Sequence, residues 1–121
     1  PAPGQGVIAL EICGENAQIK KLLAMVHHGE SSLEIQAERA FLRTFQAGCR
    51  MPVGCHASVT GKTISIVGLI ATIDGQTVFK DTIRGNACDS EKLGSALAGG
   101  LIAAGGYSIL KDLKLGFKRW I

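Results

Sequence analysis

The hydrophobic positions in the middle of the chain recur at every second residue. Three such runs cover residues 53–61, 64–72 and 76–83, and the apolar positions of the first two include Val53, Cys55, Ala57, Val59, Ile64, Ile66 and Ile70. A period of two is typical of strands with one buried face. Asp74-Gly75, between the second and third runs, favours a hairpin because Asp tolerates a positive φ and Gly adopts it freely. The pattern therefore predicts a three-stranded antiparallel meander.

A helical period precedes these runs. From Asn16 onward, apolar residues recur three or four positions apart, so we expect a helix with this stripe turned inward. The stripe is Ile19, Leu22, Leu23 and Val26. His27, His28 and Gly29 are expected to end the helix, with the histidines near the negative end of its dipole. Adjacent helical residues point in different directions, so the histidine pair is not expected to share a metal ion.

A second helix is predicted from Ser31, which together with Glu34 has the spacing of a capping box. Its apolar residues share one face, which we expect to be buried: Leu33, Ala37, Ala40, Phe41 and Phe45. Glu38 and Arg39 lie among them. A buried ion pair between these two is one interpretation, and solvation of both charges is the commoner alternative.

A last long helix is predicted to begin at Asp89 or Ser90 and to end at Gly105-Gly106. Its expected inward face comprises Leu93, Ala96, Leu97, Gly100, Leu101 and Ala104. A short terminal helix with Ile109, Leu110, Leu113 and Leu115 would follow, before a basic and aromatic tail. The order of elements predicts an α+β fold, α-α-β-β-β-α, in which a three-stranded antiparallel sheet has helices packed on one face.

Composition and charge agree with one ordinary globular domain. Of the 121 residues, 46% are hydrophobic and 19% are charged. The net charge of +3 is mild, and its one directed feature is the basic end of the chain with Lys111, Lys114, Lys118 and Arg119. The longest apolar stretch, residues 93–104, is interrupted by glycines and is expected to be too short to span a bilayer. We therefore expect a soluble protein.

The cysteines do not have the spacing of a metal or redox motif. They stand at positions 13, 49, 55 and 88 without a CxxC pair, which argues against a zinc knuckle and a thioredoxin-type site. Cys55 and His56 are neighbours on a predicted strand, so their side chains face opposite sides of the sheet and are not expected to bind one ion. Reduced thiols in an intracellular protein are the expectation.

The stretch that contains the main candidate functional residue is Ala47-Gly48-Cys49-Arg50-Met51-Pro52. Gly48 suits the left-handed turn that ends helices, and Pro52 prevents the helix from resuming, so Cys49 is predicted to lie on a tight loop. A helix C-terminus does not favour a thiolate, so activation of Cys49 would come from a neighbour such as Arg50. On local chemistry alone, a buried apolar plug is the favoured interpretation of Cys49.

Further motifs in the sequence favour a functional role for Cys49 over a buried apolar plug. In order, they are Pro1-Ala-Pro-Gly-Gln-Gly6, Ala9-Leu-Glu-Ile12, His27-His28, Ala37-Glu-Arg-Ala-Phe41 and Gly48-Cys49-Arg-Met-Pro-Val-Gly54. Each is weak alone, but in this order and spacing they resemble the C-terminal part of the porphobilinogen deaminase (hydroxymethylbilane synthase) family. The resemblance extends from Pro1 to about Leu110. Two positions depart from it: Arg50 stands where the family usually has Gln, and Cys13 lies near a usual Arg.

The resemblance implies a division of the chain. Residues 1–14 would be a strand segment of the preceding catalytic domain, with the strand itself from Val7 to Ile12, and residues 15–121 would be the C-terminal cofactor-anchoring domain. Cys49 would carry the dipyrromethane cofactor through a thioether. The catalytic residues would lie in domains outside this fragment, so the fragment is expected to anchor the cofactor without turning over substrate. No metal is expected.

The parent enzyme implied by this resemblance joins four porphobilinogen units into a linear tetrapyrrole, in tetrapyrrole and haem biosynthesis. Its partners would be porphobilinogen and the growing pyrrole chain, with no nucleic acid and no membrane, in a monomer located in the cytoplasm, or in the plastid of a plant or alga. The rival hypothesis is a double-stranded-RNA-binding module, which shares this outline of the fold. Such a module needs Lys and Arg at the start of its last helix, where Asp89, Ser90, Glu91 and Lys92 stand instead.

Overall fold

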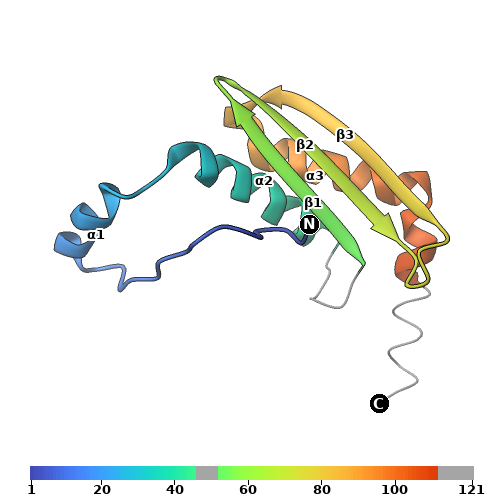
Figure 1. Ribbon diagram of the computed structural model, residues 1–121, viewed down its shortest axis with the longest axis horizontal. Helices are drawn as coiled ribbons and strands as arrows, with labels where there is room; N and C mark the ends of the chain where they lie inside the picture. The colour runs from blue at the N-terminus through green and yellow to red at the C-terminus, as the bar shows by residue number, and fades with distance from the viewer. Residues whose placement is uncertain (46–51, 112–121) are drawn as a thin grey trace, which may run out of the picture.

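Three strands form one antiparallel sheet in the order β1-β2-β3. In the computed structural model, which describes residues 1–45 and 52–111, the strands are β1 Val53–Thr60, β2 Thr63–Ala71 and β3 Val78–Asn86. Their register places Ala57 opposite Ile66 and Ile66 opposite Ile83, so these three residues lie in one row on the same face of the sheet. The predicted meander is confirmed (Figure 1).

The hairpin predicted at Asp74-Gly75 joins β2 to β3. The N–H of Thr72 donates to the carbonyl of Thr77 at 2.9 Å, and Gly75 has the positive φ of 70°. The Asp74 carboxylate accepts hydrogen bonds from the Thr72 hydroxyl at 2.5 Å and from the Gln76 N–H at 3.1 Å. These bonds, the first above all, hold the pKa of Asp74 below its usual value. Asp74 therefore stabilises the turn with its side chain.

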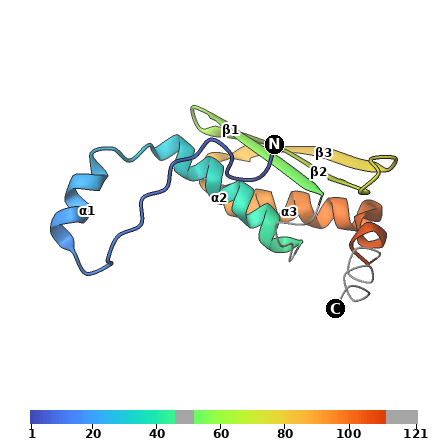
Figure 2. The same ribbon diagram turned by 60° about the horizontal axis from the view of Figure 1, so that its bottom comes forward.

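Two helices cover one face of the sheet, and no helix of the described residues covers the other face (Figure 2). They are α2 Gly29–Thr44 and α3 Ser90–Leu101, and a short 3-10 turn, η1 Ala87–Asp89, leads into α3. The buried side chains between the two layers form the core: Ala37, Phe41, Phe45, Cys55, Ala57, Ile64, Ile66, Ile70, Leu97, Ala98 and Leu101. The buried face predicted for the second helix is confirmed at Ala37, Ala40, Phe41 and Phe45, while Leu33 is partly buried.

The inward face of α3 differs from the prediction at three positions. Ala96, Gly100 and Ala104 are exposed, and the buried positions include Gly94 and Ala98 instead. A Cβ on Gly94 would overlap the carbonyl oxygen of Ala37 in α2. The two helices therefore approach each other closely at Gly94, which faces α2 together with the buried residues of α3.

The helical path continues beyond α3, through the π-helical segment η2 Ile102–Gly106, to Lys111. Gly105, at a φ of 130°, kinks it where the helix was predicted to end, and a helical turn resumes with Ile109 and Leu110 buried. The whole stretch, Ala87–Lys111, is 25 residues long and apolar enough to cross a membrane by length and composition alone. The prediction concerned the shorter apolar stretch 93–104 alone, so it stays a prediction; the helix that contains this stretch is longer. Its buried side chains, Leu97 and Leu101 among them, pack into the core described above, as expected of a core helix.

The first predicted helix is present, but its surroundings were predicted wrongly. Asn16 caps α1 Ala17–Ala24, accepting a hydrogen bond from the Ile19 N–H at 3.0 Å. The apolar stripe is not inward: no residue of α1 is buried, and Leu22 is 61% exposed. Figures 1 and 2 show why, since α1 stands away from the sheet and from α2 and α3.

The segment before α1 has no strand over residues 7–12. It is extended and mostly exposed, and Ile8 is 90% exposed. A strand needs a hydrogen-bonded neighbour, and the described strands all pair with one another elsewhere. The expected strand at Val7–Ile12, which would belong to another domain, therefore stays a prediction.

The start of α2 also differs from expectation. His28 does not end the first helix but caps the second: its Nδ1 accepts from the Ser31 N–H at 3.3 Å and lies 2.9 Å from the Ser31 hydroxyl. The helix therefore begins at Gly29, two residues before the predicted start. The capping box predicted from Ser31 and Glu34 is wrong, because the Glu34 carboxylate is engaged with β1 instead. The tail and the predicted helical residues Leu113 and Leu115 lie outside the described residues.

Candidate functional site

The predicted anchor, Cys49, lies in residues 46–51, outside the described part of the chain. The residues on both sides of that stretch contact the core and the sheet. Phe45 follows α2 and is buried, with its ring edge-to-face against Phe41 at a centroid distance of 4.9 Å. On the other side, the Pro52 carbonyl accepts a hydrogen bond from the Ala71 N–H at 3.0 Å. The chain is thus fixed at Phe45 by the core and at Pro52 by the sheet.

The remaining cysteines differ sharply in exposure. Cys55 on β1 points into the core and is 2% exposed. Burial, and after it the negative charge of Glu38, raise the pKa of the Cys55 thiol to about 12. Since the thiolate is the reactive form of cysteine, the buried and protonated thiol of Cys55 is unreactive at neutral pH.

Cys13 and Cys88 are exposed, although the apolar residues around them in the sequence favour burial. Cys13 lies in the extended segment before α1, where the described chain packs little against it. Cys88 belongs to η1, where its neighbour Ala87 takes the inward position and is 4% exposed. Apolar neighbours in the sequence were a poor guide here because short turns bury only some of their side chains.

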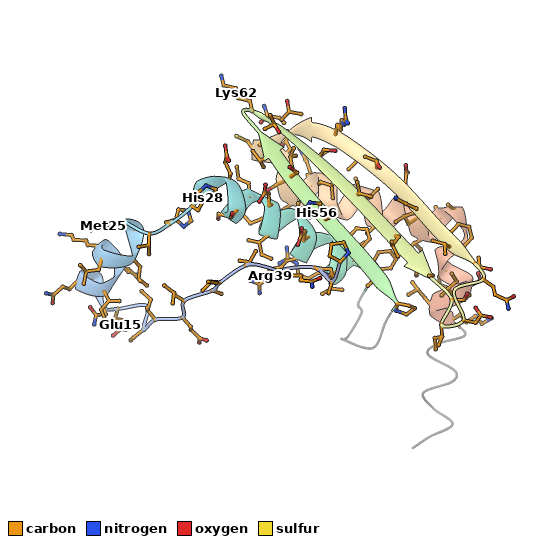
Figure 3. All side chains as sticks on the ribbon, viewed as in Figure 1. Glu15, Met25, His28, Arg39, His56 and Lys62 are labelled. Carbon is orange, nitrogen blue, oxygen red and sulfur yellow. The ribbon has the colours of Figure 1, made fainter. Side chains whose placement is uncertain are left out.

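A buried carboxylate is the functional group that sequence reasoning missed. Glu38 on α2 is 6% exposed, and both of its oxygens accept hydrogen bonds from the backbone. Oε1 accepts from the Ala57 N–H of β1 at 2.9 Å, and Oε2 accepts from the Gly4 N–H at 2.6 Å. Arg39, the other member of the suggested ion pair, is exposed, and in Figure 3 it lies beside the N-terminal segment, away from His56.

Glu34 takes part in the same arrangement. It lies one helical turn before Glu38, and its Oε1 accepts from the Val59 N–H of β1 at 2.8 Å. Two carboxylates of one helix therefore face alternate N–H groups along the free edge of β1. The only signal in the sequence was the spacing of four residues between Glu34 and Glu38, which puts them on one side of a helix.

His56 lies beside this site on the exposed face of β1. Its Nδ1 is 3.7 Å from Glu38 Oε1, and its side chain is 63% exposed. Cys55 and His56 face opposite sides of the sheet, as predicted. Over residues 1–45 and 52–111, no group of three or more His, Cys, Asp and Glu side chains is placed to hold a metal ion.

The start of α3 borders an open cavity of about 530 Å³. The charged side chains at this helix start are paired with opposite charges. Lys92 Nζ lies 3.9 Å from Asp89 Oδ1, and Nη2 of Arg43 in α2 lies 3.3 Å from Glu91 Oε1. A phosphate backbone would meet two carboxylates at this helix start. This charge pattern disfavours the double-stranded-RNA hypothesis.

A second cavity, of about 550 Å³, lies between the N-terminal segment and the facing ends of α1 and α2. Its lining combines apolar side chains with a few polar ones. They include Val7, Leu10, Leu23, Val26, Ile35 and His28. Leu23 of α1, Val26 and the apolar residues of the segment before α1 thus border one common cavity.

Comparison with known proteins gives a consistent result. Residues 32–103 match the family model described as porphobilinogen deaminase, C-terminal domain. Proteins named porphobilinogen deaminase are similar over 93% of this chain, at 42% identity in Trichlorobacter lovleyi, 39% in Geotalea daltonii and 38% in Synechococcus elongatus. The chain spans about a third of the length of these relatives, 36% of the first two and 35% of the third.

Proposed function

Since this chain belongs to the porphobilinogen deaminase family and contains that family's C-terminal domain, we propose that it is the cofactor-anchoring part of a hydroxymethylbilane synthase. The whole enzyme would join four porphobilinogen units into a linear tetrapyrrole for tetrapyrrole and haem biosynthesis. Its partners would be porphobilinogen and the growing pyrrole chain. We place the enzyme, as a monomer, in the cytoplasm, or in a plastid if the source has one.

Cys49 is the residue that we propose holds the dipyrromethane cofactor. The supporting observation is selective: Cys49 lies within the matched residues 32–103, Cys13 does not, and Cys55 is buried with a raised pKa. Cys88 is exposed and also lies within the matched residues, but it belongs to η1, outside the Gly48–Gly54 motif that carries the resemblance. A thiolate is a strong nucleophile toward carbon, and the thioether it forms is more persistent than an ester.

When bound, the dipyrromethane would supply the pyrrole carbon to which substrate units are added. The part of this chain is to hold that group in a fixed place. Phe45 and Phe41 secure the end of α2 in the core, and Pro52 is bonded to β2 through Ala71. Both attachments lie directly beside residues 46–51. They fit an anchoring role, in which the chain binds and orients without exchanging protons with the substrate.

The remaining two thirds of the enzyme would supply the catalytic residues. We propose that the exposed apolar residues of α1 and the unpaired segment at Val7–Ile12 pack against that part, with the segment as one of its strands. Consequently, the purified 121-residue chain should consume no porphobilinogen, even with preformed cofactor supplied. Turnover by this chain alone would contradict the proposed division of roles.

Intact-protein mass of the full-length enzyme that contains this chain tests the anchor. Cys49→Ser should remove the covalent dipyrromethane mass, because a serine hydroxyl is hardly ionised at neutral pH and is a poor nucleophile without an adjacent base. Cys88→Ser is the matched control, since it removes an exposed thiol within the same domain and should leave the mass unchanged. Retention of the adduct in Cys49→Ser, with circular dichroism showing a folded protein, would disprove the assignment.

A further inference from the structure

The free edge of β1 is closed by groups that do not belong to the sheet. Three alternate N–H groups point away from β2 along this edge, those of Cys55, Ala57 and Val59. Each has an acceptor: the Pro1 carbonyl at 3.2 Å, Glu38 at 2.9 Å and Glu34 at 2.8 Å, in that order. An edge strand ordinarily leaves such groups to water or to another strand. Here the edge is occupied over most of its length.

The N-terminal segment lies against this edge, close to both α2 and β1 (Figure 1). It is held from both sides, since the Pro1 carbonyl bonds to β1 and the Gly4 N–H bonds to Glu38 at 2.6 Å. Gly4 adopts a φ of 80°, and a Cβ at this position would lie 3.0 Å from Cδ1 of Ile35. Glycine therefore permits both the backbone conformation and the close approach to α2.

We propose that Glu38 is a positioning residue that clasps the segment Pro1–Gly6 to the edge of β1. A single buried side chain on α2 joins three parts of the chain: its own helix, the edge strand and the N-terminal segment. The segment is thereby held along the edge of β1 as part of this domain. The chain turns away from the domain near Gly6. Beyond it, Val7, Ile8 and Leu10 are exposed.

The chemistry of the clasp requires a carboxylate. Both oxygens of Glu38 face backbone N–H donors, so each must act as an acceptor. Glutamine has nearly the same shape but carries one acceptor oxygen and one NH₂ donor, which would face a second donor in either orientation. Glu34 provides the contrast because only its Oε1 is engaged, so glutamine can keep that bond. Glu38→Gln should therefore release the N-terminal segment, whereas Glu34→Gln should leave it in place.

Amide hydrogen exchange of the 121-residue chain, followed residue by residue with NMR, tests the proposal. In Glu38→Gln, the amides of Gly4 and Cys55 should exchange at least about tenfold faster than in the unchanged chain, because the segment detaches. The Glu34→Gln control should leave both rates unchanged. Equal Gly4 and Cys55 rates in Glu38→Gln and the unchanged chain would overturn the proposal, as would an unprotected Gly4 amide in the unchanged chain.

Loss of amide protection in the central strand β2 would show that Glu38→Gln fails to fold. In that case Gly4→Ala provides a second test. Alanine is strained at a φ of 80°, and its Cβ would contact Ile35. The substitution should therefore detach the N-terminal segment without changing a residue of the core. We expect faster exchange at Cys55, while Ala57 stays protected because Glu38 still accepts from it. An unchanged rate at Cys55 would show that Pro1–Gly6 is not held through Gly4 and would overturn the proposal.

Discussion

Gly94 of α3 lies directly against the backbone of Ala37 in α2, so close that the position has no room for a Cβ. A Cβ built there would overlap the Ala37 carbonyl oxygen and would lie 3.0 Å from the carbonyl carbon. Because the atoms it meets are backbone atoms of a buried helix, no side-chain rotation can relieve the overlap. This contact sets the distance between the two helices that cover the sheet.

Gly94→Ala should therefore destabilise the fold by about 1–3 kcal/mol or more, since it forces the two helices apart. Gly99→Ala is the matched control: it lies in the same helix, its Cβ would meet nothing within 4 Å, and it should stabilise by about 0.5–1 kcal/mol through helix propensity. Urea unfolding followed by circular dichroism measures both changes. Equal stability of the two variants would show that the helices are not in contact at Gly94.

The aromatic pair at the end of α2 gives a second prediction. Phe41 and Phe45 are 0% and 2% exposed, so Phe41→Ala and Phe45→Ala should each cost about 3–5 kcal/mol through lost burial and the cavity left behind. Tyr107→Ala, which truncates an exposed aromatic ring, should change the free energy of unfolding by less than about 0.5 kcal/mol. A loss below a kilocalorie at either phenylalanine would remove that ring from the core.

The sheet and the buried face of α2 could be predicted because their signals are local. Alternation from Val53 to Ile70 decides which side chains face inward, and Asp74-Gly75 marks its own turn through hydrogen bonds to residues two positions away. The buried face of α3 was harder to assign. Small residues occur on several sides of this helix, and only the contact of Gly94 with another helix determines which side is buried.

The role of Glu38 could not be predicted, since its two donors lie 34 and 19 residues away in the sequence. A charged residue beside Ala37 and Ala40 is compatible with either exposure or burial until the path of the N-terminal segment is known. The stripe on α1 failed for a related reason. Periodicity shows that one side of a helix is apolar, but it does not show what that side contacts.

Cysteine exposure leads to a third prediction. Limited alkylation of the native chain should modify Cys13 and Cys88 well before Cys55, because Cys55 is buried and its pKa is raised to about 12. Denaturant should make Cys55 react as readily as the other two. Peptide mapping of the alkylated chain reads out each site, and early labelling of Cys55 would contradict its placement in the core.

The raised pKa of Cys55 also predicts how stability depends on pH. In the unfolded chain this thiol ionises near its ordinary pKa of 9.0, whereas in the folded chain it stays protonated up to about 12. Above pH 9 the unfolded state therefore binds fewer protons than the folded state, and stability falls as pH rises. The contribution is fully present below pH 9 and is lost toward pH 12, with a slope of at most about 1.4 kcal/mol per pH unit.

Cys55→Ala isolates this contribution, because every other titrating group is shared by the two proteins. The free energy of unfolding should be measured at intervals from pH 7 to pH 11 for both. We expect the difference between them to be constant up to the ordinary pKa and then to change in favour of the alanine variant, which has no thiol to ionise. Parallel curves over the whole range would mean that the Cys55 thiol ionises equally easily in the folded chain, which is incompatible with its burial.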